Sequence, residues 1–488
     1  MLAAVDLGSN SFRLHIGRHE GDAIRVVKSA RDPIRLAAGL DSQGALTPEA
    51  MQKAVASLRR FREILNAYPI AGLRAVATNT IRIASNAAAL LPLAEAALGC
   101  PIEVISGEEE GRLIYMGAAN TIAVPGERRL VLDIGGGSTE VILGRGQEVV
   151  KVESFSIGTV RHSASFFPDG KITEAAFAAA ILSARSQFED AAPPYQPRHW
   201  RKAYGSSGTM RALSEAIGKG GLGDGRLTLK SLYALKQYCL QCADMRQLAL
   251  NGVKPERVAM VVGGLAILIG LMTEFHIDVL LTVDAGLRMG VMWDLHGRAT
   301  QRDRRELAVQ NLATMFHADL SRANRVADMV RSLYLQLKPA SDAYVRLLHW
   351  SAMLHEVGMV VSHTGYHKHG AYLIEHADLA GFTSREQKAM SRLILSQKGN
   401  LRKVGDALAD LDFAKAVLAL RLAVTLMHTR TELDFGDFRL KMKNRIELEI
   451  QQDWATQHPT LAFWLQKEIE SWREVGIDFS VSSKTAVA

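Results

Sequence analysis

Two short turns rich in glycine and serine each follow an aspartate at the end of an apolar stretch. The first reads Asp6-Leu7-Gly8-Ser9-Asn10-Ser11 and the second Asp133-Ile134-Gly135-Gly136-Gly137-Ser138-Thr139. Backbone N–H groups in such turns form a concave site for phosphate oxygens, and hydroxyl groups add donors. A carboxylate beside the phosphates can hold Mg²⁺ directly or through water. A single turn of this kind is better explained as a simple hairpin, but its repetition favours a paired phosphate site.

The elements that must position these turns are also repeated. Strand-like segments flank the first turn at residues 3–5 and 11–17, and the second at residues 130–134 and 140–143. The same unit of strand, acidic residue, small-residue turn and strand is thus used twice, which predicts two similar lobes facing each other across a cleft. A third small-residue loop, residues 205–209 with Gly208, leads into a helix.

An acidic segment, Ser106-Gly107-Glu108-Glu109-Glu110-Gly111-Arg112, follows another predicted strand. The spacing of Ser106 and Glu109 is that of a capping box, which gives Glu109 a structural role. Glu110 shares a helix face with apolar residues and should turn inward, whereas Glu108 should face water. A glutamate crowded by other carboxylates can act as a general base toward water. The alternative, that the three acids only suit the helix N-terminus, remains equally open.

Two arginines are further candidates. Arg82 ends the segment Thr78-Asn79-Thr80-Ile81-Arg82 after a predicted strand, and Arg257 precedes an apolar run in the second lobe. A guanidinium group offers a planar fork to phosphate oxygens, although surface arginines are common. Neither GxxxxGK[ST] nor GxGxxG is present, so a P-loop or a Rossmann dinucleotide site is not supported.

The composition is that of an ordinary globular protein with a moderate excess of positive charge. The 488 residues predict about three domains, and the formal charge of +7 suits an anionic ligand. Three cysteines cannot form a disulfide framework, and no signal-peptide core is found, so we expect a soluble, cytoplasmic chain. The uncharged run at residues 258–272 is shorter than the ~20 residues of a membrane helix. We interpret it as a buried strand turning into a buried helix.

The remaining pattern predicts an α/β class protein with a helical end. Strand and helix signals alternate until a polar, basic stretch at residues 296–305, and mainly helical signals follow. The basic residues Arg439, Lys441, Lys443 and Arg445 alternate as on a strand. We therefore predict lobes at residues 1–118 and 119–298 and a C-terminal domain at 299–488.

Five motifs, taken in order, resemble those of the exopolyphosphatase and guanosine pentaphosphate phosphohydrolase (Ppx/GppA) family. They are AVDLGSNSFRL, ATNTIR, VISGEEEGRLIY, VLDIGGGSTEVILG and YGSSGT. The resemblance covers nearly the whole chain. It implies two actin-like (ribonuclease H-like) lobes around a cleft, followed by a mainly helical HD-like C-terminal domain.

The resemblance also implies roles for individual residues. Glu110 corresponds to the glutamate that activates the attacking water, and Arg82 and Arg257 to arginines that face the substrate chain. Acidic positions beside the metal correspond to Asp6, Asp133 and Glu140. The phosphate-binding positions are Ser9, Asn10, Ser11, Gly136, Gly137 and Ser138, to which we add Gly208 of the third loop.

The C-terminal domain departs from the HD pattern. His355 is followed by Glu356 in place of the aspartate, and Val424 stands where a ligand aspartate is expected. No histidine occurs in the upstream segment 322–326. We therefore expect this domain to guide long anionic chains and to form a dimer interface, without metal binding or catalysis.

The resemblance implies an exopolyphosphatase that releases orthophosphate processively from inorganic polyphosphate with Mg²⁺. We expect a homodimer that binds no nucleic acid. The Gly-Gly-Gly-Ser turn ending at Ser138 favours polyphosphate, because pentaphosphate enzymes tend to have alanine at the position of Gly137. The alternatives are a guanosine pentaphosphate phosphohydrolase, an acceptor-dependent phosphotransferase of the sugar-kinase type, and a silent phosphate sensor.

Overall fold

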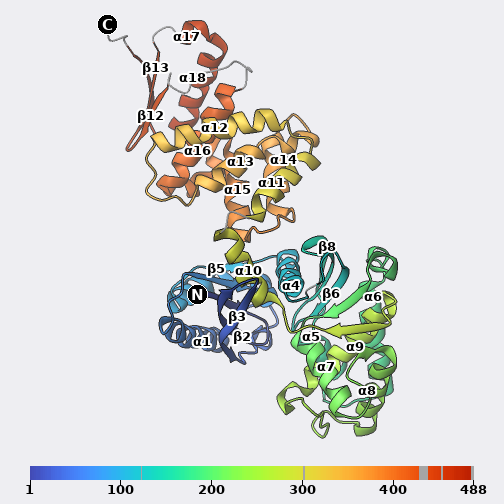
Figure 1. Ribbon diagram of the computed structural model, residues 1–488. Coiled ribbons are helices and arrows are strands. Elements are labelled where there is room, and N and C mark those ends of the chain that lie inside the picture. Colours follow the sequence, from blue (N-terminus) through green and yellow to red (C-terminus); the bar gives the residue numbers. More distant parts are fainter. Residues whose placement is uncertain (123, 300–302, 428–437, 452–453, 485–488) are drawn as a thin grey trace. The chain divides into compact units, whose positions relative to one another are not determined.

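The computed structural model of the chain describes residues 1–122, 124–299, 303–427, 438–451 and 454–484. It divides into two compact units, Met1–Asp303 and Arg304–Ala488. The first unit is blue to yellow-green in Figure 1, and the second is yellow to red.

The first unit holds two mixed sheets. The first sheet has the order β3-β2-β1-β4-β5, and the second has the order β10-β11-β9-β6-β7-β8. The strands of the first are β1 (Leu2–Leu7), β2 (Phe12–Glu20), β3 (Ala23–Asp32), β4 (Gly72–Ala77) and β5 (Ile102–Val104). Those of the second are β6 (Arg128–Ile134), β7 (Thr139–Arg145), β8 (Glu148–Phe155), β9 (Lys202–Gly205), β10 (Leu227–Thr228) and β11 (Val279–Thr282).

The predicted duplication is confirmed in detail. In each lobe an antiparallel meander of three strands is joined by parallel pairing to two further strands, so that β3-β2-β1-β4-β5 corresponds to β8-β7-β6-β9-β11. The β-bulge between Ile16 and Gly17 recurs between Leu143 and Gly144, five residues into the equivalent strand. Each small-residue turn therefore joins the first two strands of its lobe.

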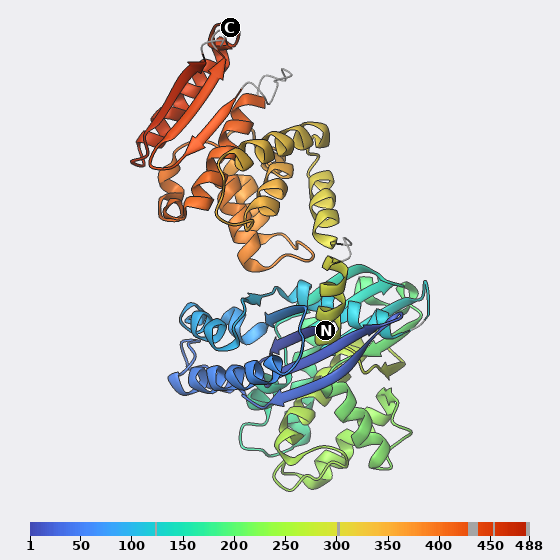
Figure 2. The ribbon, with the colours of Figure 1, turned by 60° about the vertical axis from the view of Figure 1, so that its left-hand side comes forward.

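Helices cover both sheets (Figures 1 and 2). They are α1 (Pro48–Asn66), α2 (Asn79–Ile83), α3 (Ala87–Leu98), α4 (Gly107–Thr121), α5 (Thr159–Phe166), α6 (Glu174–Phe188), α7 (Gly208–Lys219), α8 (Leu229–Cys242), α9 (Val258–Glu274) and α10 (Leu287–Ala299). Thr47 caps α1 and accepts a hydrogen bond from the backbone N–H of Ala50. Cys239 packs in the core of the second lobe, in keeping with a packing role for this thiol.

The prediction of a strand within residues 258–272 is wrong, because this run lies entirely in α9. Its glycines do not break the helix but let other segments approach it. A Cβ atom on Gly263 would lie 2.1 Å from Ser163 Oγ, and one on Gly264 would lie 2.4 Å from a methyl group of Thr209. The helical segment Pro255–Glu274 is long and apolar enough to cross a membrane by composition alone, but 72% of its most apolar window is buried inside the protein.

Helix α4 joins the two lobes and packs closely on α10. A Cβ atom on Gly290 would lie only 1.7 Å from the backbone O of Leu113, and one on Gly117 would lie 2.5 Å from that of Gly286. On its other side, α4 approaches the second sheet, since a Cβ on Gly111 would lie 2.5 Å from Val152. Glycines thus allow direct backbone contact with the α10 segment on one face of α4 and close approach of Val152 on another.

A buried ionic network fixes the same helices. Arg112 on α4 binds Glu109 at 2.6 Å and Asp294 of α10 at 2.7 Å. Arg74 of β4 binds Asp294 at 2.8 Å and Glu103 at 2.7 Å. Because each of these buried charges has partners of opposite sign, removing one would leave an uncompensated charge in the core.

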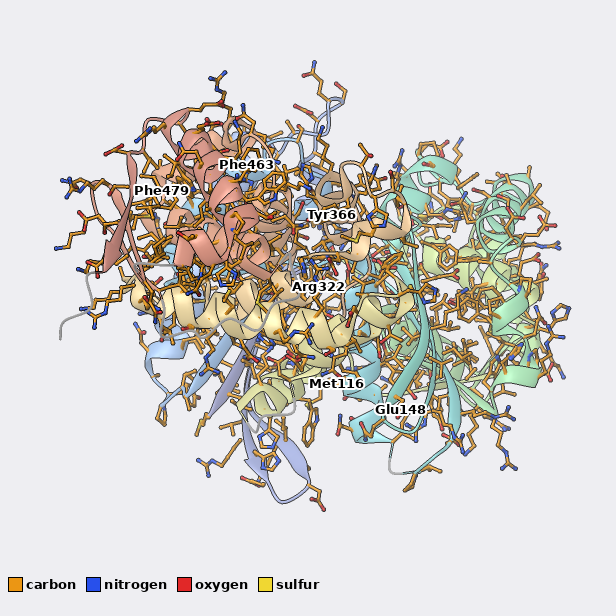
Figure 3. All side chains as sticks on the ribbon, turned by 90° about the horizontal axis from the view of Figure 1, so that it is seen from above. Met116, Glu148, Arg322, Tyr366, Phe463 and Phe479 are labelled. Atoms are coloured by element: carbon orange, nitrogen blue, oxygen red, sulfur yellow. The ribbon has the colours of Figure 1, made fainter. Side chains whose placement is uncertain are left out.

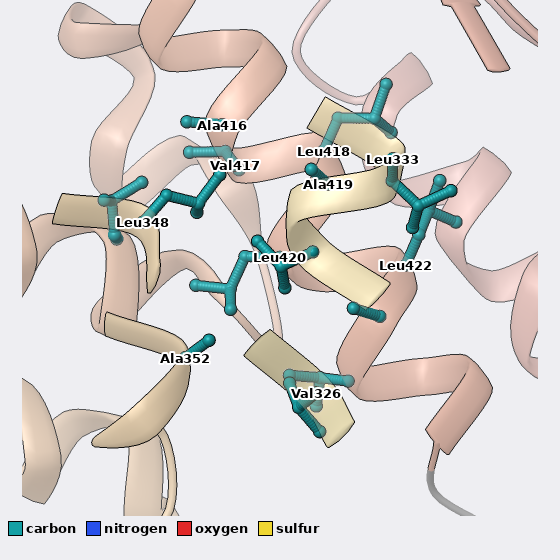
Figure 4. Close-up of a cluster of buried hydrophobic side chains, with 14 of the residues drawn as sticks. Val326, Leu333, Leu348, Ala352, Ala416, Val417, Leu418, Ala419, Leu420 and Leu422 are labelled. Carbon is teal, nitrogen blue, oxygen red and sulfur yellow. The ribbon is translucent and has the colours of Figure 1, made fainter. Parts of the chain in front are cut away.

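The second unit is mainly helical, as predicted. Its helices are α11 (Arg304–Met315), α12 (Leu320–Gln336), α13 (Val345–Met353), α14 (Tyr366–His376), α15 (Ser384–Ser396), α16 (Leu411–Leu426), α17 (Trp454–Gln457) and α18 (Pro459–Arg473). Leucine, valine and alanine side chains of α12, α13 and α16 form its core (Figure 4). Val424 belongs to this core. Glu356 forms an ion pair with Arg322 at 3.3 Å, and Arg322 is labelled in Figure 3.

A small sheet completes the second unit, with the strands β12 (Arg439–Met442), β13 (Ile446–Gln451) and β14 (Phe479–Lys484) in that order. The predicted basic strand is only partly right. Arg439 and Lys441 lie on the exposed face of β12, whereas Lys443 and Arg445 lie in the turn that follows.

The contact between α4 and α10 can be tested with Gly290→Ala. The added methyl group would meet the backbone of Leu113, which cannot rotate away, so the helices must separate. We expect the free energy of unfolding of the first unit to fall by ~1–3 kcal/mol. Denaturant unfolding followed by circular dichroism measures it, with Gly405→Ala as the control, since a Cβ there meets nothing within 4 Å. Equal stability of the two variants would contradict this packing.

Candidate active site

A cavity of about 550 Å³ opens in the first unit where both turns, the third loop, α4 and α10 meet. Most of the predicted site residues line it, namely Asp6, Ser9, Asn10, Ser11, Glu110, Asp133, Gly136, Gly137, Ser138, Gly208 and Arg257. Arg82 and Glu140 are not among its lining residues but adjoin Glu110. The cavity therefore brings together nearly all residues that the sequence singled out.

The two turns face each other across this cavity. A Cβ atom on Gly136 would lie 3.4 Å from the Cβ of Ser9, and one on Gly137 would lie 2.5 Å from Asn79 Oδ1. Gly158 lets the segment before α5 pack on the second turn, because a side chain there would lie 2.5 Å from the backbone N of Gly137. Two lobes far apart in sequence thus meet at their equivalent turns.

The backbone carbonyl groups of each turn accept hydrogen bonds from neighbouring segments. Ser9 and Asn10 accept hydrogen bonds from Ala37 and Arg35, and Gly135 and Gly136 accept them from Thr159 and Val160, all at 2.9–3.0 Å. In the described part of the chain, the N–H groups of Ser9, Asn10, Gly136 and Gly137 make no hydrogen bond. These amides are free to bind the oxygens of an anion.

Glu110 lies in the first turn of α4 and is buried, with 9% of its surface exposed. Its Oε2 atom lies 3.7 Å from Arg82 Nη1 and makes no hydrogen bond with any described residue. Burial raises its pKa well above the usual value, and the charge of Glu140 raises it further. A buried carboxylate with an unsatisfied oxygen facing a cavity is poised to accept a proton.

Glu109 has a structural role, as predicted, but its carboxylate acts through ion pairs. Ser106 caps α4 and accepts a hydrogen bond from the Glu109 N–H, as expected. The Glu109 carboxylate binds Arg112 at 2.6 and 2.8 Å, so it belongs to the buried ionic network. Glu108 is the most exposed of the three glutamates, as predicted.

Further carboxylates surround Glu110. Asp133 accepts a hydrogen bond from Ser206 Oγ at 2.6 Å, and Glu140 accepts one from Ser154 Oγ at 2.9 Å. Burial raises the pKa of Asp6 and raises the pKa of Asp133 to about 6. It also raises the pKa of Glu140 to about 8, to which the charge of Asp133 contributes. A group of buried acids that disfavour one another's ionisation suits a site that takes up a cation.

A magnesium ion fits the two turn aspartates. Within the described residues, no group of three or more His, Cys, Asp or Glu side chains is arranged to hold a metal. Mg²⁺ usually binds proteins through one or two carboxylates together with water and substrate phosphates. Asp6 and Asp133 both line the cavity, whereas Glu140 does not, so the two aspartates are better placed than Glu140 to meet an ion in it.

Four cavity arginines escaped the sequence analysis. They are Arg13 of β2, Arg31 of β3, Arg211 of α7 and Arg288 of α10, and they join Arg257. Burial and neighbouring arginines lower the pKa of Arg31 and Arg257, and lower that of Arg288 to about 10. Arg13 and His15 alternate along β2 with buried apolar residues, so they share the face opposite the core, and this face borders the cavity.

The two arginines that were predicted behave differently. Arg257 lines the cavity and donates to the backbone O of Gly208 at 3.0 Å. Arg82 lies on α2 rather than at the end of a strand, and it donates to the backbone O of Ile105 at 2.7 Å. Its guanidinium group also lies 3.7 Å from Glu110 Oε2, so it can steady that carboxylate.

Comparison with known proteins agrees with this geometry. The model of the Ppx/GppA phosphatase family matches residues 15–299, and that of Ppx/GppA phosphatase domain III matches residues 304–469. The chain belongs to the Ppx/GppA phosphatase family. Its first unit accordingly has the actin-like ATPase fold of that family, and its second unit is the helical domain III.

Solved structures similar to this chain include two named as exopolyphosphatase or exopolyphosphatase-like and one named as a PPX-GPPA enzyme. An exopolyphosphatase from Cytophaga hutchinsonii is 25% identical, with a TM-score of 0.55 and coverage of 61% of this chain and 98% of that chain. An exopolyphosphatase-like protein is 27% identical (TM-score 0.54, 62% and 98% coverage). A PPX-GPPA enzyme from Aquifex aeolicus is 25% identical (TM-score 0.51, 59% and 97% coverage).

The cation assignment predicts that Mg²⁺ stabilises the first unit and that Asp133→Asn removes this effect. At a concentration one hundred times its dissociation constant, a bound ion adds about 2.7 kcal/mol. Thermal unfolding with and without Mg²⁺ measures the shift. The control is Asp284→Asn, a carboxylate of the same cavity that pairs with Arg211. An undiminished shift in Asp133→Asn would contradict the assignment.

Proposed function

We propose that this phosphatase is an exopolyphosphatase that hydrolyses the terminal phosphate of inorganic polyphosphate with Mg²⁺. The observation that carries the proposal is the set of five arginines, Arg13, Arg31, Arg211, Arg257 and Arg288, in the cavity that also holds both turns and Glu110. Arg13, Arg257 and Arg288 are half-buried, whereas Arg31 and Arg211 are exposed. Because positive charges gathered on one cavity repel one another, the site favours a ligand with several adjacent negative charges. A similar structure bears the name exopolyphosphatase.

The cavity lining favours a phosphate chain over guanosine pentaphosphate. Among the described residues, no phenylalanine, tyrosine or tryptophan lines the cavity, so no such ring is available to stack on a guanine base. Its apolar lining consists of aliphatic side chains and methionines such as Ile114, Met260 and Leu287. The five arginines of the cavity instead suit a ligand with repeated phosphate groups.

In the proposed reaction, the Glu110 carboxylate takes a proton from a water molecule whose oxygen attacks the terminal phosphorus. The new P–O bond forms as the bridging P–O bond breaks, giving orthophosphate and a chain shorter by one phosphate. The turn amides and the arginines bind the phosphate oxygens and lower the free energy of the charged transition state. Magnesium held by Asp6 and Asp133 would neutralise phosphate charge.

The rival activities are separated by one assay. Orthophosphate release is measured from long-chain polyphosphate and from guanosine pentaphosphate, each with and without Mg²⁺. Release from polyphosphate without an acceptor would exclude a phosphotransferase, and binding without release would indicate a phosphate sensor. Faster release from the pentaphosphate would overturn the substrate assignment.

The proposal extends to the rest of the chain. The basic surface of the second unit, including Arg439 and Lys441, would guide long polyphosphate chains and make hydrolysis processive. We place the enzyme in the cytoplasm as a homodimer that does not bind nucleic acid.

The role of Glu110 is tested with Glu110→Gln, which keeps the shape of the side chain but cannot accept the proton of water. We expect turnover of polyphosphate to fall by about 10²-fold or more while polyphosphate binding and folding persist. Glu108→Gln, in the same turn of α4, is the matched control. Near-normal turnover in Glu110→Gln would remove the general-base assignment.

The pH dependence of turnover follows from the carboxylate cluster. A general base works when ionised, and the raised pKa of Glu110 places the loss of activity on the acid side above the range of an ordinary glutamate. In Glu140→Gln the neighbouring charge is gone, so the pKa of Glu110 falls and this loss should move to lower pH.

The measurement is the pH profile of kcat/KM for both proteins. Glu148→Gln, an exposed position at the start of β8 in the same sheet, is the control and should leave the profile unchanged (Glu148 is labelled in Figure 3). A profile that stays in place, or moves to higher pH, in Glu140→Gln would show that Glu140 does not influence the base.

A further inference from the structure

Arg288 enters the cavity from the first turn of α10 and is held there by a histidine. Its Nη1 atom lies 2.6 Å from His15 Nε2, and its Nε atom lies 3.9 Å from Asp6 Oδ2. The Arg288 side chain is 22% exposed, so the guanidinium group is largely desolvated but still faces the cavity.

The contact defines the state of the imidazole. A guanidinium group can only donate, so His15 Nε2 must accept and the proton must reside on Nδ1. His15 Nδ1 is buried and makes no hydrogen bond with any described residue. Burial, with the charges of Arg288 and Arg13, lowers the pKa of His15 to about 3, which agrees with a neutral ring.

A neutral partner has a specific consequence for the arginine. Arg74 and Arg112, outside the cavity, are held by carboxylates that cancel their charge. The imidazole of His15 fixes the direction of the Arg288 guanidinium but leaves its positive charge intact. The Asp6 carboxylate, 3.9 Å from Nε, offsets that charge only in part and makes no hydrogen bond with it. A fixed cation that keeps most of its charge in a poorly solvated site stabilises negative charge on a reacting group far more than a mobile one in water.

We propose that Arg288 binds oxygens of the phosphate group nearest the reacting end of the chain, and that His15 is a positioning residue that orients Arg288 without neutralising it. This inference rests on the proposed hydrolysis of polyphosphate. The place of Arg288 beside Asp6 puts it at the end of the cavity where the first turn lies. It therefore acts on phosphates next to the bond that breaks.

The first test is Arg288→Ala assayed with long-chain polyphosphate and Mg²⁺. We expect kcat to fall by about 10²-fold or more. Added guanidinium ion at millimolar concentration should restore at least a tenth of the lost rate, because it can occupy the vacated space. The same addition should not help Glu110→Gln, which is the control. A merely structural arginine would give no such selective rescue.

The second test separates charge from shape at His15. His15→Gln offers a neutral acceptor, whereas His15→Glu offers a carboxylate that would hold Arg288 more tightly and cancel its charge. We expect His15→Glu to keep its thermal stability and yet lose at least tenfold more kcat than His15→Gln. A purely structural contact predicts the reverse order.

Three outcomes overturn the inference. Wild-type kcat in Arg288→Ala removes the role of Arg288, and equal kcat in the two His15 variants removes the role of His15. If the unmodified enzyme releases no orthophosphate from polyphosphate, the proposed function fails and the inference fails with it. If Arg288→Ala does not fold, Arg288→Lys replaces it, and a kcat equal to that of the wild type again refutes the proposal.

Discussion

Crowding of like charges is the constraint on which the site depends. Glu110 is buried beside Glu140 and within electrostatic reach of Asp6 and Asp133, so ionising any one of these acids is opposed by the others. On the same cavity, arginines oppose one another in the same way. The first unit holds both arrangements within a framework of paired charges and closely packed helices. A bound cation would reduce the repulsion among the acids, and a bound phosphate chain would reduce the repulsion among the arginines.

The structure around the cavity keeps these repelling charges in place. Around the cavity, charges are fully paired, as in the network of Arg74, Arg112 and Asp294, and backbones touch through glycines such as Gly290. Buried pairs of this kind add little net stability, but they resist displacement, because breaking one leaves an isolated charge. Like charges thus repel one another in the site, whereas the charges of the surrounding structure are paired with opposite ones. This division matches the demands of phosphoryl transfer, in which positioning and charge stabilisation dominate.

The sequence was most informative where local chemistry determines structure. The strand-turn-strand repeat and the inward position of Glu110 followed from residue spacing, and the motif order pointed to the family. The α9 segment was misread because Gly263 and Gly264, which suggest a break, serve close packing against Ser163 and Thr209. Arg211 and Arg288 gave no local signal, since their contribution depends on how α7 and α10 meet the turns of both lobes. The position of these arginines beside the turns results from tertiary packing and cannot be predicted from a short segment of sequence.

Helix α10 has a bearing on how the chain acquires its structure during synthesis. It packs against β1 and β4 of the first lobe, and its residues Val291 and Met292 share a small core with Ala4 and Val76. One face of the first sheet therefore stays uncovered until nearly three hundred residues have left the ribosome. The first lobe must wait for the whole second lobe to emerge, with apolar surface open to chaperones or to aggregation. Slow codons or stalling before α10 would prolong that exposure.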